Sequence, residues 1–234
     1  MGRLHQPPKR RPARMRLCFV NPNSTVEMTE RMVDQARGLA PRDFVITGVT
    51  NTAGPASIQG QADGEAAELG TLSLLADGGF DLGVIGCFDD TGLPIARSRS
   101  AMPLVGLGEA SFISAHDRAE PFIVMTTSHL SVPVLEANIA SYKLRRHCLG
   151  VFASGVPVLD FEHDRANAKE RLVAQARRRC AEYTQTRTLV LGCAGMGGLA
   201  ADLSQELNLT VVDPIEAALS LARKQLQNAS EISA

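Results

Sequence analysis

The sequence predicts an α/β fold in which short parallel strands alternate with helices. Apolar strand-like segments and amphipathic helical segments follow one another along most of the chain, as in parallel sheets whose connections are helices. Several strand segments are near-continuous apolar runs, which is typical of strands covered by helices on both faces. The third observation is a repeated motif, a strand that ends in Gly-Cys, at Cys87 and again at Cys193. This repetition favours two four-stranded lobes over a single eight-stranded sheet.

The expected strands are short apolar segments bounded by glycine or polar residues. They lie at 16–20, 44–49, 81–87, 103–107, 121–126, 148–152, 188–192 and 209–212. The expected amphipathic helices lie at 25–38, 63–78, 109–117, 131–145, 163–183, 197–207 and 214–227. Strands one to four would build the first lobe, strands five to eight the second, and the last helix would return to the first lobe.

The chain is therefore expected to have three parts. Residues 1–14 contain five Lys or Arg residues, three prolines and no acidic residue, which predicts a disordered basic arm. The first lobe is expected to comprise residues 15–115 together with 213–234, and the second lobe residues 116–212.

The composition of the chain excludes several classes of function. It has 234 residues, of which 44% are hydrophobic and 21% charged, with a formal net charge of −1. This is an ordinary globular composition without a general attraction to nucleic acid or to anionic membranes. Trp is absent and Tyr occurs twice, which disfavours an aromatic platform for nucleic-acid bases. No apolar run approaches the roughly 20 residues of a membrane-spanning helix, and no signal peptide is recognisable.

The cysteines indicate a reducing compartment. There are five, an odd number, and they do not form the pattern of a secreted disulfide framework. We therefore expect a cytoplasmic protein. There is no CxxC or HExxH motif and no cluster of His and Cys, so no bound metal is expected.

The carboxyl ends of the predicted strands are polar and rich in glycine. Ligands of open parallel sheets collect at these ends, so the functional site is expected there. The segments that follow strands one, three, four, five and seven read NPNST, GCFDDTG, GLGEA, TTSH and GCAGMGG.

Cys87 and Cys193 are the candidate catalytic residues. Each follows an apolar strand and opens a loop in which backbone N–H groups favour the thiolate. A single buried cysteine is usually an inert packing residue, but two in equivalent places indicate chemistry. Inversion of a carbon acid needs a base on one face of the carbon and an acid on the other, and a thiol serves in either role. A neighbouring carbonyl stabilises the carbanion, so no cofactor is expected.

The motifs NPNST, GCFDDTGL, VGLGEA, TTS and LGCAGM, in this order and at these spacings, resemble the Asp/Glu/hydantoin racemase superfamily, in particular its hydantoin and allantoin racemase branch. The resemblance extends from about residue 15 to the C-terminus. It implies two pseudo-symmetric Rossmann-like lobes with the active site in the cleft between them, and a homo-oligomer. It also implies that Cys87 and Cys193 are the acid/base pair of a cofactor-independent racemase that inverts C5 of a cyclic ureide, such as a 5-substituted hydantoin or allantoin.

The substrate-binding candidates lie in the same motifs. A neutral ureide ring needs amide, hydroxyl and backbone partners, although helix capping or turn formation is an ordinary alternative for each polar residue. The candidates are Asn21, Phe88, Asp89, Thr126, Thr127, Gly192, Ala194, Gly195 and Met196. The family commonly has proline where this chain has Thr91, which leaves the stiffness of that loop and the substrate preference open.

Two alternative functions remain at this point. One is an amino-acid racemase of the Asp/Glu type, or a related isomerase or decarboxylase; amino-acid racemases usually carry a CNT-type sequence after the first cysteine, whereas Asp89 and Asp90 would repel a substrate carboxylate. The other is a non-catalytic α/β module that binds a small molecule, in which both cysteines only pack. Alkylation of the two thiols with and without substrate distinguishes catalysis from binding alone.

Overall fold

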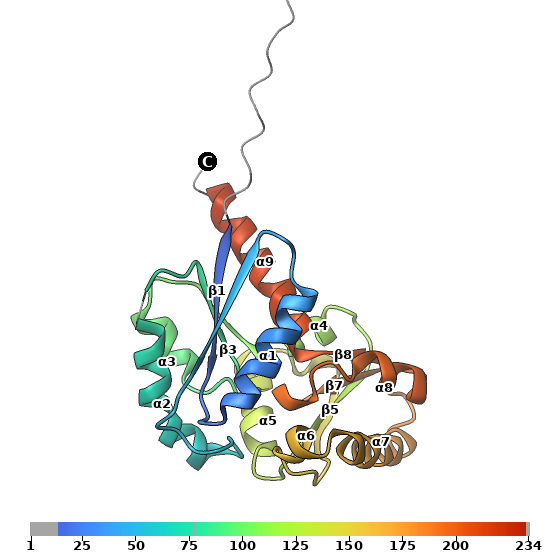
Figure 1. Cartoon of the computed structure of the whole chain (residues 1–234). Helices are drawn as coiled ribbons and strands as arrows, with labels where there is room; N and C mark the ends of the chain where they lie inside the picture. The colour runs from blue at the N-terminus through green and yellow to red at the C-terminus, as the bar shows by residue number, and fades with distance from the viewer. Residues whose placement is uncertain (1–13, 77, 233–234) are drawn as a thin grey trace, which may run out of the picture.

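The computed structural model describes residues 14–76 and 78–232, and in these residues the expected strands are all present (Figure 1). The predicted basic arm over 1–14 lies outside the described residues, apart from Arg14. The strands are β1 Met15–Asn21, β2 Phe44–Thr50, β3 Leu82–Ile85, β4 Leu104–Gly106, β5 Phe122–Thr126, β6 Cys148–Ala153, β7 Thr188–Leu191 and β8 Thr210–Val212.

The strands form two parallel four-stranded sheets with the same strand order. The first sheet has the order β2-β1-β3-β4 and the second β6-β5-β7-β8, and neighbouring strands are parallel throughout. Strand β1 therefore corresponds to β5, and β3 to β7. This confirms the predicted α/β class and the two lobes. The lobe boundaries at 115/116 and 212/213 stay a prediction, supported by the way the strands divide between the sheets.

The helices include two that the sequence patterns did not give as separate elements, α3 and α6. The helices of the described residues are α1 Val26–Leu39, α2 Gln61–Ala76, α3 Leu93–Arg99, α4 Leu107–His116, α5 Val132–Ser141, α6 Asp160–His163, α7 Arg165–Glu182, α8 Ala200–Leu207 and α9 Pro214–Ile232. Helix α5 is shorter than expected because Lys143 adopts a left-handed φ of 61°, which ends a right-handed helix. Within residues 14–76 and 78–232, none of these helices combines the length and the apolar character needed to span a bilayer.

Helix α1 shows how the sequence determines which face of a helix is buried. Met28, Met32, Val33 and Ala36 recur at helical spacing and are all buried, while the residues between them are mostly exposed. Figure 1 shows α1 and α9 on one side of the first sheet, and α2 and α3 on the other. Because helices cover both faces, the central strands β1 and β3 are buried and apolar.

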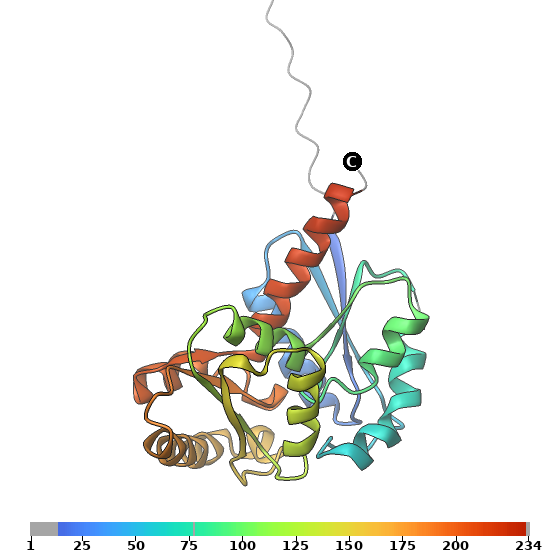
Figure 2. The ribbon, with the colours of Figure 1, turned by 180° about the vertical axis from the view of Figure 1, so that it is seen from behind.

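A continuous apolar core connects the two lobes. Buried side chains of the first sheet, α4, α9 and the second sheet belong to one cluster, which includes Phe19, Phe112 and Phe122. A second cluster fills the space between the second sheet and helices α6, α7 and α8. Seen from behind in Figure 2, α5 (yellow-green) lies near the middle of the molecule, between the second sheet and α2 of the first lobe. The core thus holds the carboxyl ends of the two sheets near one another.

Candidate functional site

Cys87 and Cys193 occupy equivalent positions in the two sheets. Each is the second residue after the third strand of its sheet, since Cys87 follows β3 and Cys193 follows β7. The shared strand order therefore explains why two short motifs far apart in the sequence carry the same residue at the same place.

A glycine separates each cysteine from its strand, and both glycines have a structural reason. The Gly86 N–H donates to the carbonyl of Val20 (2.7 Å) and the Gly192 N–H to that of Met125 (2.9 Å), so each extends its sheet by one bond. A Cβ on Gly192 would lie 2.9 Å from the Met125 oxygen. Side chains at these positions would push the loops outward, and the two cysteines with them.

The two cysteines line a single cavity at the carboxyl ends of both sheets. Its volume of about 30 Å³ is room for one or two water molecules. Cys193 is buried and Cys87 is partly exposed. The cavity is lined by Asn23, Met28, Ile58, Gly86, Cys87, Phe88, Asp89, Thr126, Thr127, Ser131, Val158, Gly192, Cys193 and Ala194.

Most of the residues predicted for the site are among these lining residues. The structure brings together Cys87, Phe88, Asp89, Thr126, Thr127, Gly192, Cys193 and Ala194. Asn21, Gly195 and Met196 do not line this cavity. The hydroxyl of Thr126 donates to the carbonyl of Gly192 (3.0 Å), which joins the end of β5 to the loop that carries Cys193.

Asn21 lies beneath the site, with 1% of its surface exposed. Its side-chain amide nitrogen lies within hydrogen-bond distance of Asn23 Oδ1 (3.0 Å), the Thr25 carbonyl (3.1 Å) and Thr29 Oγ1 (3.0 Å). Its side-chain oxygen accepts from the Asn23 N–H (3.1 Å). Asn21 therefore fixes the turn between β1 and α1, and Asn23 is the amide that reaches the cavity.

Burial dominates the ionisation of both thiols. It raises the pKa of Cys193 to about 12, although the backbone N–H groups of Gly195 and Met196 lower it. Burial also raises the pKa of Cys87 well above its ordinary value, and the charge of Asp89 and the nearby Cys193 thiol raise it further. The Thr91 hydroxyl and the Asp89 N–H lower it. Both shifts favour the thiol over the thiolate.

Thr91 stands beside the first thiol. Its hydroxyl is buried and has no hydrogen-bond partner among the described residues, and it lowers the pKa of the Cys87 thiol. A proline at this position would lack that hydroxyl. The departure from the family pattern therefore adds a polar group next to Cys87.

Asp89 carries the negative charge of the cavity. Burial raises the pKa of its carboxyl to about 6, and hydrogen bonds from the Ser131 hydroxyl and the Gly60 N–H lower it. The Ser131 Oγ–Asp89 Oδ2 distance is 3.2 Å. Asp89 is thus largely ionised above neutral pH, and its charge raises the pKa of Cys87 and of Cys193.

The sequence predictions missed several lining residues. Met28 comes from α1, Ile58 from the loop after β2, Ser131 from the start of α5, and Val158 from the loop after β6. Apart from Ser131, these residues are apolar and look like ordinary core residues in the sequence. The available signal was their position in the sequence, because Ile58 and Val158 follow the carboxyl ends of β2 and β6, where ligands of parallel sheets bind.

The loop that carries Cys193 is fixed from two sides. Arg165 donates to the carbonyl of Gly195 (2.8 Å) and to that of Gly197. Asp213 accepts from the N–H of Gly198 (2.6 Å) and from the side chain of Gln35 on α1 (3.0 Å). These contacts hold the segment after β7 in one conformation.

An ion pair connects the lobes beside the cavity. Arg31 on α1 lies 2.7 Å from Glu162 on α6, whose side chain is 4% exposed. Glu162 also raises the pKa of Cys193. Within the part of the chain that the structure describes, no three His, Cys, Asp or Glu side chains converge in a way that would hold a metal ion.

Comparison with known proteins agrees with this geometry. The family model described as Asp/Glu/Hydantoin racemase matches residues 17–222. A hydantoin racemase from Rhizobium meliloti is 34% identical over 215 residues, which cover 91% of this chain and 89% of the relative. The crystal structure of allantoin racemase from Pseudomonas fluorescens superimposes with a TM-score of 0.87 at 29% identity and covers 92% of both chains. Allantoin racemase from Klebsiella pneumoniae gives a TM-score of 0.83 at 30% identity and covers 94% of this chain and 89% of that one. The chain belongs to the Asp/Glu/hydantoin racemase family, and it is a racemase.

Proposed function

We propose that this racemase inverts C5 of a hydantoin-type cyclic ureide, a 5-substituted hydantoin or allantoin, by proton transfer between C5 and two thiols. The observation that carries the proposal is the pair Cys87 and Cys193, which line one cavity from equivalent strand ends of two sheets. The names of the relatives, hydantoin racemase and allantoin racemase, support this class of substrate.

The reaction needs one thiolate and one thiol. The thiolate takes the proton from C5, an S–H bond forms, and the electron pair of the broken C5–H bond moves toward the oxygen of the adjacent ring carbonyl. The other thiol then donates its proton to the opposite face of C5 and becomes the thiolate. The two sulfurs have exchanged protonation states, so the enzyme is ready for the other enantiomer without a cofactor.

The raised thiol pKa values make each thiolate a strong base but a scarce one in the closed cavity, whereas a general base works best with a pKa near the operating pH. Groups that stabilise the thiolates are therefore needed for the reaction. The N–H groups of Gly195 and Met196 stabilise the Cys193 thiolate, and the Thr91 hydroxyl stabilises that of Cys87. These donors offset part of the effect of burial on the two thiols.

The polar lining of the cavity suits a neutral ring. The Asp89 carboxylate accepts a hydrogen bond from a ring N–H. The Asn23 amide and the Thr127 hydroxyl donate hydrogen bonds to the ring carbonyls. Met28, Ile58 and Val158 are available to the apolar parts of the substrate, and Asn21 acts indirectly by fixing Asn23. The charge of Asp89 disfavours substrates with a carboxylate, which argues against an amino-acid racemase.

A cavity of about 30 Å³ is too small for a five-membered ring, and we propose that the lobes part to admit the substrate. Closure around the ring then excludes water from the thiolate and brings one sulfur to each face of C5.

The test is polarimetry in heavy water. D- and L-forms of several 5-substituted hydantoins and of allantoin are incubated with the protein, and optical rotation and deuterium at C5 are followed together. Racemisation with deuterium incorporation at C5 is the expected result. If the protein racemised aspartate or glutamate and no ureide, the amino-acid racemase alternative would replace the proposal. If it bound a ureide without exchanging the C5 hydrogen, the protein would instead be a binding module.

We also propose a cytoplasmic homo-oligomer. The family resemblance supports the oligomer, and the free thiols of all five cysteines support a reducing compartment. Light scattering coupled to size-exclusion chromatography measures the oligomeric state, and a monomeric mass over the working concentration range would contradict it.

A further inference from the structure

The loop that carries Cys87 is held by side chains from the other lobe. The Ser131 hydroxyl donates to Asp89 Oδ2 (3.2 Å), the Asn138 amide donates to the Asp89 carbonyl (2.9 Å), and the Tyr142 hydroxyl donates to Asp90 Oδ2 (2.8 Å). All three donors belong to α5 or to its ends. We name Ser131, Asn138 and Tyr142 the α5 polar stripe.

The spacing of the α5 polar stripe places it on one helical face. Its members are seven and four residues apart, which brings them to the same side of an α-helix. Leu135 and Ile139 on this helix are fully or almost fully buried in the apolar core that connects the two lobes. The face of α5 that carries these donors therefore also packs on the core shared by the lobes, and its donors reach the loop of Cys87 in the other lobe.

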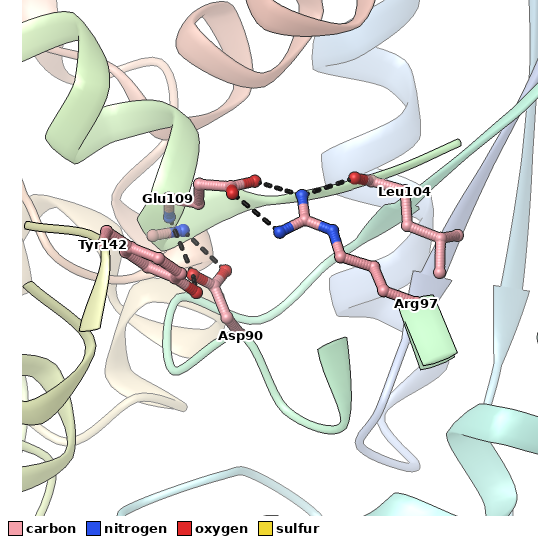
Figure 3. Close-up of polar contacts among 6 residues, drawn as sticks. Asp90, Arg97, Leu104, Glu109 and Tyr142 are labelled. Carbon is pink, nitrogen blue, oxygen red and sulfur yellow. Dashed lines mark hydrogen bonds and ion pairs between the residues drawn. The ribbon is translucent and has the colours of Figure 1, made fainter. Parts of the chain in front are cut away.

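Asp90 connects the stripe to a second helix (Figure 3). Besides the Tyr142 hydroxyl, its carboxylate accepts the N–H groups of Gly108 (2.9 Å) and Glu109 (2.7 Å) in the first turn of α4. These N–H groups have no partner inside α4, so the Asp90 carboxylate caps the N-terminus of this helix although it lies 18 residues earlier in the sequence. A Cβ on Gly108 would lie 2.9 Å from Asp90 Oδ2, so only glycine leaves room for this contact.

The backbone of Asp90 adopts a conformation that is uncommon for a residue with a side chain. Its φ of 52° lies in the left-handed region, which costs about 1 kcal/mol for a residue with a side chain. The Asp90 N–H donates to the Cys87 carbonyl (3.1 Å), which closes a turn directly after the cysteine. The geometry of Cys87 and that of the Asp90 carboxylate are therefore fixed together.

The charge of Asp90 has neighbours on several elements. Glu109 on α4 is paired with Arg97 on α3, which also donates to the Leu104 carbonyl (2.7 Å), as Figure 3 shows. Glu65 and Glu68 of α2 line the cavity of about 380 Å³ that Asp90 borders on its other side. Burial raises the pKa of Asp90 to about 7, while the Tyr142, Glu109 and Gly108 donors lower it.

We propose that the α5 polar stripe is a positioning element, which holds the loop of Cys87 against Cys193 when the lobes are together. The proposal rests on the function assigned above to the two cysteines. Parting of the lobes breaks these three hydrogen bonds, and closure restores them together with the alignment of the thiols. Ser131, Asn138 and Tyr142 thereby make proton transfer depend on closure.

The test is Tyr142→Phe, which removes one hydroxyl and keeps the ring on Phe112. We expect kcat for racemisation to fall about tenfold with little change in KM, because alignment and not substrate contact is lost. Loss of the Tyr142 donor also raises the pKa of Asp90, so the acidic limb of the kcat profile should move to higher pH. The matched control is Tyr183→Phe, since Tyr183 packs on Phe152 at the end of α7, away from the site.

A second measurement is independent of racemase activity. Iodoacetamide alkylation of each cysteine is followed by mass spectrometry, and Tyr142→Phe should speed alkylation of Cys87 several-fold while Cys193 changes less than about twofold. Asn138→Leu removes a different donor and should give the same pattern. Unchanged kcat and unchanged Cys87 alkylation in both variants would overturn the proposal. If the wild type racemises no substrate, the alkylation pattern still decides whether the stripe holds the loop.

Discussion

Asp89 and Cys87 lie two residues apart in one loop, and the Asp89 carboxylate raises the pKa of the Cys87 thiol. The same carboxylate raises the pKa of Cys193, which comes from the other sheet. One charge thus acts on both sulfurs of the site. It makes both thiolates stronger bases and at the same time disfavours a negatively charged substrate.

Replacement of Asp89 by Asn should lower the pKa of both thiols. The amide keeps the size of the carboxylate and its capacity to accept from Ser131, but it removes the charge. Alkylation of Cys87 and Cys193 at pH 8 should accelerate by up to about tenfold, which corresponds to one pKa unit. Asp34→Asn is the control, because the Asp34 side chain is 76% exposed on α1. Equal alkylation rates in Asp89→Asn and wild type would show that the charge does not act on the thiols.

Substitution of either cysteine of the proposed acid/base pair should abolish racemisation. We expect Cys87→Ser and Cys193→Ser each to lower kcat by a factor of about 1,000 or more, because a hydroxyl is far less acidic than a thiol. One variant should still exchange the C5 hydrogen of one enantiomer with deuterium, since one base remains. Polarimetry and proton NMR in heavy water measure the two effects separately.

Cys148→Ser provides the control for these variants, because Cys148 starts β6 and does not line the cavity. It should retain wild-type racemisation. If either Cys87→Ser or Cys193→Ser racemised at the full rate, the two-base scheme would be wrong.

Thr91 offers a more selective change at the first thiol. Thr91→Val keeps the shape of the side chain and removes the hydroxyl that lowers the pKa of Cys87. Alkylation of Cys87 at pH 8 should slow by about threefold to tenfold, and that of Cys193 should not change. Thr91→Ser restores the hydroxyl and should recover most of the rate. Slower alkylation of both cysteines in Thr91→Val would indicate a general structural change instead.

The sequence predicted the strands and the cysteine pair because both signals are local. An apolar run of four to seven residues ending in glycine is visible in the chain itself, and the two Gly-Cys sites mark the same place in each sheet. The prediction that Asn21 binds substrate was different. Asn21 and Asn23 are both amides in one turn, and only the hydrogen bonds of that turn decide that Asn21 is enclosed and Asn23 faces the cavity.

The hydrogen bonds between the lobes could not be predicted from the sequence either. Ser131, Asn138 and Tyr142 are ordinary polar residues of a helix, and Asp90 looks like a local helix cap. Their partners lie 42 to 52 residues away, and nothing in the local pattern specifies which helix face meets which loop. Ile58 and Val158 similarly resemble core residues in the sequence, and only the arrangement of the two sheets shows that they line the cavity.

The pH dependence of stability gives a final prediction. The carboxyls of Asp89 and Asp90 have an ordinary pKa of 3.8 and folded-state values of about 6 and about 7. A raised folded-state pKa means that the folded protein binds the proton more tightly than the unfolded chain does. The stability that these two groups contribute is therefore fully present below pH 4 and is lost as the pH rises through 6 and 7.

Thermal unfolding at several pH values measures this effect. Because other groups also titrate, the pH dependence of Tm is compared between a variant and the wild type. Asp90→Asn removes one carboxyl and should reduce the fall in Tm between pH 5 and pH 8 by about 5 °C. Its Tm should be lower than that of wild type at pH 8, because the amide cannot accept all three donors. Asp34→Asn, with its exposed side chain, should keep the wild-type slope. A slope in Asp90→Asn equal to that of wild type would mean that Asp90 is already ionised at pH 5 and that its hydrogen bonds outweigh its burial.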